Sequence, residues 1–392
     1  MPPIFELIES WSSREPLTLP DEPPPGDKTL RFVAGAWDGI ATHQGWADQK
    51  LPDRANIVAT LQAASATDDL TLWHEIAEAA TTLSSPEQYE EIVNSLELDD
   101  SSQRSRVAST ARWLVRNTAQ RQPLKLGLLL LGRTGSIADV EDLLVMARHD
   151  EFTLFAAEAA ARLLADPTSV WWQMAQAVHG WGRIQVVEKL AGRIQHRPDI
   201  QAWLLRYGCA NDIMPEYLAY ICATKGCLAE ALSASVDDAL VDGAGVIVCA
   251  LLGGGPAEGM IDYRDGVAVV QTLLRHLQVR CDSLERLYVV YQINRWLDWP
   301  EPRNVLPHML ATTPWLDHYE DDIRAKWERL RAMGWTDAVR ASCFESSVGI
   351  LGTPRWPAVV RERFHQGDRN ARAIAWGVAP AVALDLWEDG FQ

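Results

Sequence analysis

Apolar residues recur three and four positions apart along most of the chain, from about Asp53 onward. The pattern is clearest from Arg104 to Pro167, where apolar stretches alternate with short polar turns. Such spacing is typical of amphipathic helices, and short links make neighbouring helices antiparallel. The chain is therefore predicted to be all-α over this region.

Residues that begin and end helices agree with this pattern. Ser136, followed three residues later by Asp139, predicts an N-cap with a weakened capping box, because Asp replaces the usual Glu. Gly135 suits the exit of the preceding helix. Ser283 predicts another N-cap, for a helix that Pro300 ends.

Residues 1–50 follow a different pattern. The stretch LTLPDEPPPGD, residues 17–27, carries four prolines, which favour an extended conformation. Residues 29–40, TLRFVAGAWDGI, combine strand-like positions with a predicted turn at residues 36–39. We expect an extended N-terminal arm with a short strand pair, packed on the helical body through Trp37 and Trp46.

The helical segments recur at a regular spacing. Similar apolar segments end near Leu131, Leu163, Leu190 and Cys222, which are 32, 27 and 32 residues apart. A period of roughly 20–50 residues is the mark of stacked repeats. The sequence therefore predicts an array of helical pairs.

One stretch of this array resembles a known family. Residues 143–167, LLVMARHDEFTLFAAEAAARLLADP, resemble a HEAT-type repeat, in which a helix, a short acidic turn and an alanine-rich second helix recur. The resemblance covers residues 105–165 and extends to about residue 232. Phe155 and Ala156 occupy the region where the family usually has an arginine, so the repeats are degenerate.

The resemblance implies a fold and no particular reaction. The expected fold class is all-α, a right-handed α-solenoid of HEAT-like helical hairpins with a short extended or β N-terminal arm. We expect the arm in residues 1–50, the HEAT-like repeats in residues 51–235, and a C-terminal helical region in residues 236–392 that continues the solenoid. Such folds offer a concave surface to a partner.

Charge narrows the choice of partner. The net charge is −17, and residues 1–100 alone carry 5 Lys or Arg against 19 Asp or Glu. Phosphate backbones and anionic membranes are repelled by such a surface, so nucleic acid and membrane are not the expected partners. A basic protein partner fits this charge, although solubility alone also explains it.

The sequence shows no evident secretory signal and no evident membrane-spanning segment. The start MPPIFELIESW lacks a cationic region followed by an apolar run and a cleavage site. The chain has no run of 18 apolar residues. Its six cysteines are dispersed in apolar contexts, which favours reduced, buried thiols. We therefore expect a cytoplasmic protein.

The usual signatures of catalysis and metal binding are missing from the sequence. Zinc sites need ligand pairs two to four residues apart, whereas Cys222 and Cys227 are five apart and have no second pair nearby. The nine histidines form no H-E-x-x-H motif. The glycine-rich loop at residues 249–266 lacks the Gly-Lys-Ser/Thr of a phosphate loop. We expect no metal, no cofactor and no catalytic residue.

Two charged groups are candidates for partner binding. Seven cations form a basic stripe in thirty residues: Arg104, Arg106, Arg112, Arg116, Arg121, Lys125 and Arg133. Arg112 and Arg116 share a helix face, beside Trp113. The acidic group consists of Asp237, Asp238, Asp242, Asp262 and Asp265. These aspartates suit an arginine-rich partner, but helix capping explains them equally well.

We predict a non-catalytic, protein-binding α-solenoid, and within that class a bacterial immunity or antitoxin-like inhibitor of a toxin or other basic protein. The predicted partner-binding residues are Arg112, Trp113, Arg116, Asp237, Asp238, Asp242, Asp262 and Asp265. One alternative is a nucleic-acid-binding HEAT-like protein or glycosylase-type enzyme that uses the basic stripe. Another is a small-molecule-binding or resistance protein with a pocket lined by Trp171, Trp172, Trp181 and Trp203.

Overall fold

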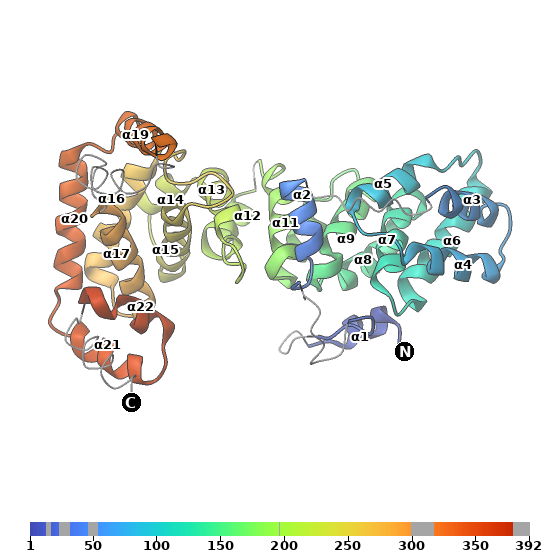
Figure 1. Ribbon diagram of the computed structural model, residues 1–392, viewed down its shortest axis with the longest axis horizontal. Coiled ribbons are helices and arrows are strands. Elements are labelled where there is room, and N and C mark those ends of the chain that lie inside the picture. Colours follow the sequence, from blue (N-terminus) through green and yellow to red (C-terminus); the bar gives the residue numbers. More distant parts are fainter. Residues whose placement is uncertain (13–16, 23–31, 46–53, 196, 299–316, 379–392) are drawn as a thin grey trace. The chain divides into compact units, whose positions relative to one another are not determined.

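Helices make up all the regular structure that is described for this 392-residue chain (Figure 1). The structure, a computed structural model, describes residues 1–12, 17–22, 32–45, 54–195, 197–298 and 317–378. Within these ranges it contains no strand, so the all-α class is confirmed. No helix in them is long and apolar enough to cross a membrane.

The chain divides into two compact units. Unit 1 comprises Met1–Gln195 with Asn211–Ile213, and unit 2 comprises His196–Ala210 with Met214–Gln392. These units follow from internal packing, whereas the predicted divisions at residues 50 and 235 follow from composition and repeat spacing. The predicted boundaries at residues 50 and 235 therefore stay a prediction.

Unit 1 is built from helices α1 to α11. Their bounds are α1 Ile4–Ser10, α2 Ala36–Gln44, α3 Arg54–Ala64, α4 Leu70–Ala80, α5 Pro86–Ser95, α6 Ser101–Asn117, α7 Arg121–Thr134, the short 3₁₀ helix η1 Ile137–Asp139, α8 Val140–Met146, α9 Asp150–Leu163, α10 Thr168–Ala177 and α11 Gly180–Ala191. Helix α7 packs against α6 and α9, and α9 packs against α11. Helix α7 is buried on all sides along residues 123–132, which are apolar or glycine except for Lys125.

The predicted caps of unit 1 are present. Ser136 and Asp139 form the capping box, in which the Asp139 carboxylate accepts from the Ser136 backbone N–H at 2.7 Å. Asp100 forms another box with Gln103 at the start of α6. These reciprocal bonds satisfy backbone donors that a helix start leaves open. Local chemistry thus defines where these helices begin.

Unit 2 contains the remaining helices. Their bounds are α12 Pro198–Trp203, the π-helical turn η2 Leu204–Gly208, α13 Glu216–Lys225, α14 Leu228–Ser233, α15 Asp238–Gly253, α16 Gly266–Arg280, α17 Leu284–Leu297, α19 Asp317–Ala332, α20 Asp337–Leu351, α21 Trp356–His365 and α22 Arg369–Val378. Helix α15 packs against α13 and α17, and α17 packs against α20 and α22. The predicted cap at Ser283 is confirmed, since its hydroxyl accepts from the backbone N–H of Arg286 at 3.3 Å.

The N-terminal arm differs from the prediction. The turn expected at residues 36–39 is wrong, because these residues open helix α2. The strand pair is not found within residues 1–12, 17–22 and 32–45, and residues 29–31 lie outside the described part. The expected packing of Trp37 is confirmed, since its indole donates to the Ser84 carbonyl at 2.7 Å. Trp46 lies outside the described residues.

A close helix contact in unit 2 supplies a test of the packing. A Cβ added at Gly243 of α15 would lie 2.1 Å from the Leu205 carbonyl oxygen of η2. We expect Gly243→Ala to lower the free energy of unfolding by roughly 2 kcal/mol, because backbone cannot move aside as a side chain can. Urea unfolding measures the change.

Gly349→Ala in α20 is the matched control, since a Cβ there meets nothing within 4 Å. This variant should raise the free energy of unfolding by roughly 0.5–1 kcal/mol, because Ala is the better helix former. A stabilising Gly243→Ala would contradict the close contact of α15 with η2.

Candidate functional site

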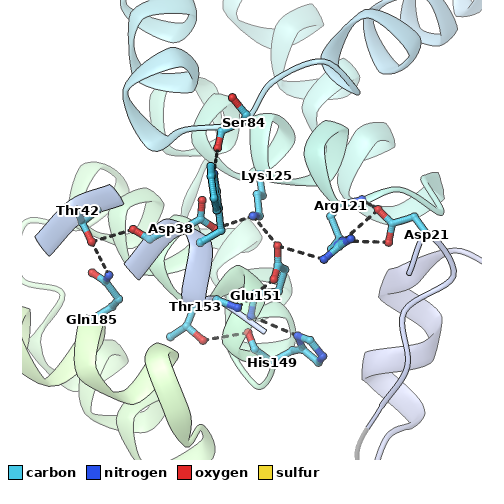
Figure 2. A network of polar contacts seen from close by, with 12 residues as sticks. Asp21, Asp38, Thr42, Ser84, Arg121, Lys125, His149, Glu151, Thr153 and Gln185 are labelled. Atoms are coloured by element: carbon cyan, nitrogen blue, oxygen red, sulfur yellow. Dashed lines mark hydrogen bonds and ion pairs between the residues drawn. The ribbon is translucent and has the colours of Figure 1, made fainter. Parts of the chain in front are cut away.

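A buried ionic network joins N-terminal segments of unit 1 to its helical body (Figure 2). At its centre is Lys125 of α7, whose ammonium donates to Asp38 of α2 and to Glu151 of α9, at 2.6 Å in both cases. The three side chains are at most 10% exposed. One buried cation therefore holds together three helices that are distant in the sequence.

The network continues through the other oxygen of Glu151. This oxygen accepts from the backbone N–H of Gly35 at 3.0 Å. Gly35 has a φ of 73°, a left-handed conformation that costs glycine little and other residues more. Arg121 lies 3.8 Å from Glu151 and donates its Nε and backbone N–H to Asp21, at 3.2 and 2.9 Å. Both residues 17–22 and the start of α2 are thus bound to α7 and α9.

Burial and neighbouring charges shift the pKa values of these groups in opposite directions. Burial alone would lower the pKa of Lys125, but the carboxylates of Asp38 and Glu151 raise it above its ordinary value. Burial raises the pKa of Asp38, which Lys125 only partly offsets. The pKa of Glu151 is lowered, because Lys125 and Arg121 outweigh its burial. The raised pKa favours the charged form of Lys125, which suits a bridge between the two carboxylates.

His149 and Asp150, at the start of α9, border the network. Burial lowers the pKa of His149 to about 4, and its Nδ1 accepts from the Glu151 backbone N–H at 3.3 Å. Burial raises the pKa of Asp150 to about 7, although the Gly182 backbone N–H donates to it at 2.8 Å. At neutral pH the imidazole is uncharged and Asp150 is partly protonated.

Most of the basic stripe is engaged within unit 1. Arg112 donates to both oxygens of Asp139 at 2.6 and 3.0 Å, and Arg116 donates to both oxygens of Asp142 at 2.7 and 2.5 Å. Trp113, between them, lies against the His74 ring. Six of the seven cations donate to acceptors in the same unit: Arg106, Arg112, Arg116, Arg121, Lys125 and Arg133.

The predicted acidic group lies in unit 2, at the starts of α15 and α16. Asp237 accepts from Arg206, and Asp238 accepts from Arg280. Asp262 accepts from Arg329 and from the Gly259 backbone N–H. Asp265 is exposed at the N-cap of α16, where its side chain makes no capping bond. Their role toward a partner stays a prediction.

Asp242 differs from these aspartates because it lines an open groove of about 1190 Å³ in unit 2. Helices α15 and α17 form most of the groove, with contributions from the start of α13 and from α22. Asp242 accepts from Arg286 at 2.7 Å at the end where both helices begin. Small-molecule pockets usually measure about 300–1,000 Å³, so this groove has room for a larger occupant.

The lining of the groove is mixed. Its apolar part includes Val241, Val246, Cys249, Leu252, Tyr288, Val289 and Trp296. Its charged part consists of Glu216, Asp242, Glu285, Asp298, Arg286 and Arg295. The sequence revealed only Asp242 among these, because a groove between helices depends on which helices become neighbours.

Two of the four tryptophans predicted to line a pocket, and most of the cysteines, are buried. Trp171 and Trp181 are each 4% exposed in unit 1, and the Trp171 indole donates to the Ala157 carbonyl. Trp203 belongs to unit 2. Four cysteines are buried as predicted, namely Cys209, Cys222, Cys281 and Cys343, whereas Cys249 is half-buried and the prediction is wrong for Cys227, which is exposed. Burial raises the pKa of Cys281 and Cys343 to about 11, so these thiols are not activated.

The network predicts a large effect of Lys125→Met. The change leaves two carboxylates buried without their cation, so we expect the free energy of unfolding to fall by roughly 3–5 kcal/mol. Hydrogen exchange should accelerate in residues 36–44, since α2 loses its anchor. Lys189→Met is the matched control, because Lys189 pairs with Glu158 at partly exposed positions and should lose less than about 1 kcal/mol. Equal losses would contradict the bridging role.

The pH dependence of stability follows from His149 and Asp150. A folded pKa below the ordinary 6.5 makes stability rise with pH between about 4 and 6.5 for His149. A folded pKa above the ordinary 3.8 makes stability fall with pH between 3.8 and about 7 for Asp150. The two contributions oppose each other over most of this range.

The substitution Asp150→Asn removes the contribution of Asp150 to the pH dependence of stability. The variant's free energy of unfolding, relative to the unsubstituted chain, should increase by up to about 4 kcal/mol from pH 4 to pH 8, since each pKa unit corresponds to about 1.4 kcal/mol. Urea unfolding across this range measures the difference. A difference that does not vary with pH would contradict the raised pKa.

Comparison with known proteins adds no assignment to these observations. No family model, no curated protein and no solved structure matches the chain. The resemblance of residues 105–165 to HEAT repeats thus rests on those residues alone.

Proposed function

We propose that this chain is a non-catalytic, protein-binding helical-repeat protein whose binding surface includes the groove along α15 and α17. The observation that carries the proposal is an open groove of about 1190 Å³ with apolar side chains along two helices. Val246 is 36% exposed there. Apolar surface in a concave site, rimmed by charge, is typical of places where a partner docks.

A HEAT-like α-solenoid is the architecture that we propose for this function. Helices α7, α9 and α11 begin at Arg121, Asp150 and Gly180, so their starts are 29 and 30 residues apart. Each packs on the next, while α6, α8 and α10 pack on α7, α9 and α11 respectively. Two parallel rows of this kind support stacked hairpins.

Within this class, an immunity or antitoxin-like inhibitor remains our proposal for the biological role. Support comes from the net charge of −17, which favours a basic protein. The nucleic-acid alternative loses support, because six cations of the basic stripe already donate to acceptors in unit 1. Phosphates would have to displace these bonds.

Cross-linked affinity capture in the cell that makes the chain tests the proposal. Val246→Glu puts a charge on the apolar part of the groove, so proteins that dock there should no longer be recovered. Val348→Glu is the matched control, because Val348 is a 47% exposed valine of α20 outside the groove lining. We expect the control to retain the partners. Recovery of the same proteins with both variants would overturn the proposed surface.

A further inference from the structure

We propose that the groove in unit 2 takes one amphipathic α-helix of a partner protein, with apolar residues along its middle and Lys or Arg at both ends. This inference rests on the proposed function, since it requires that the groove binds protein. It adds the conformation and the charge of the occupant. The observations that carry it are the length of the groove, its apolar centre and its carboxylates that make no ion pair within the described part of the chain.

The two helices that form the groove run side by side in the same direction. Arg286 pairs with Asp242, and one turn further along a Cβ added at Gly245 would lie 2.7 Å from Val289. Both pairs are offset by 44 residues, so α15 and α17 keep one register over this stretch. Helix α15 has 16 residues and α17 has 14.

Each helix lines the groove with a single face along its whole length. On α15 the lining residues are spaced by three and four, as in Val241, Gly245, Cys249 and Leu252. On α17 the same spacing joins Glu285, Tyr288, Gln292 and Arg295. At 1.5 Å per residue, the groove is about 20 Å long. It accommodates about four turns of a docked helix.

The middle of the groove is apolar and lacks a sheet edge. Val246, Cys249, Tyr288 and Val289 are all partly exposed there. An extended peptide needs partners for its backbone N–H and C=O groups, and side chains of two helices offer few of them. A helix satisfies its own backbone and buries one apolar face in such a groove.

Unpaired carboxylates surround this apolar middle. Glu216, Glu285 and Asp298 line the groove, and among the described residues none of them makes an ion pair. They contrast with Asp242, whose charge is already met by Arg286. Among the cations that line the groove, Arg295 alone makes no ion pair with a described residue.

These carboxylates occupy both ends of the groove. Glu285 lies in the first turn of α17, and two further aspartates, Asp238 and Asp282, crowd around Arg286 at that end. Glu216 lies near Gly253, where α15 ends, and Asp298 caps the end of α17. The carboxyl ends of both helices add partial negative charge at the Glu216 end, whereas their amino ends add partial positive charge at the Glu285 end. At the amino end Glu285 and the three aspartates around Arg286 outweigh this partial charge, so a docked helix gains from cations at both of its ends.

Binding of synthetic helices to the full chain tests this inference. The probe is a labelled peptide of about 14 residues, with Leu and Ala at helical spacing in the middle and Lys or Arg at each end. A photo-crosslinker in its middle reports where it docks. Fluorescence anisotropy should show binding that weakens as salt increases, and the crosslinks should fall on α15 and α17.

The triple variant Glu216→Lys, Glu285→Lys and Asp298→Lys should weaken this binding at least about tenfold. Its matched control is Glu258→Lys, Glu328→Lys and Glu362→Lys, which changes the net charge equally at exposed positions outside the groove. The control should bind the peptide with a change of less than about threefold, since distant exposed charges are screened.

Three results would overturn the inference. They are equal weakening by both triple variants, equal binding of a peptide with Glu at its ends, and equal binding of a peptide whose middle prolines prevent a helix. The proposed function would fail separately. Partners that depend on Val246 without binding of the cationic helix would keep the groove as a protein-binding surface and refute only the chemistry of its occupant.

Discussion

A single buried cation determines how the parts of unit 1 are joined. Lys125 lies between Asp38 and Glu151, which are 87 and 26 residues away in the sequence. A buried ammonium is tolerated only when carboxylates meet its charge. Helices α2, α7 and α9 must therefore assemble together or leave a charge unpaired. Desolvation offsets much of the attraction within such a bridge, so its net contribution to stability is smaller than the loss expected when Lys125 alone is removed.

Other charged side chains also pair between helices of the same unit. Arg112 and Arg116 form bidentate pairs with Asp139 and Asp142, so these guanidinium groups join α6 to η1 and α8. In unit 2, Arg286 is 8% exposed and lies among Asp238, Asp242 and Asp282. These charged clusters join helices within each unit, and their role toward a partner stays a prediction. Charges available to a partner are better sought where no such pairing occurs, as at the groove.

Local features of the fold could be predicted from the sequence, and distant contacts could not. The Ser136 and Ser283 caps depend on residues three positions away, and both predictions are confirmed. The turn predicted at residues 36–39 is wrong because α2 is stabilised by contacts with α5, α7, α9 and α11, which a local pattern does not contain. One available signal was overlooked, namely that Lys125 stands within the apolar run Leu124–Leu131. A lysine in such a run calls for a buried carboxylate.

The groove depends on a further property that no local pattern records, the size of the side chains on facing helices. The groove is lined by the small residues Gly245, Cys249 and Ala250 of α15 and by the aromatic residues Tyr288 and Trp296 of α17. Small residues allow the backbones to approach closely at Val289, and they leave an open space above this contact that their own side chains do not fill. The larger aromatic residues become one wall of the space. In the rim, the carboxylates that make no ion pair among the described residues outnumber the one such cation, Arg295. Self-association through this apolar surface is therefore opposed by like charge, while a cationic helix gains both apolar burial and ion pairs. A surface that serves one basic partner must bind that partner and not a second copy of itself.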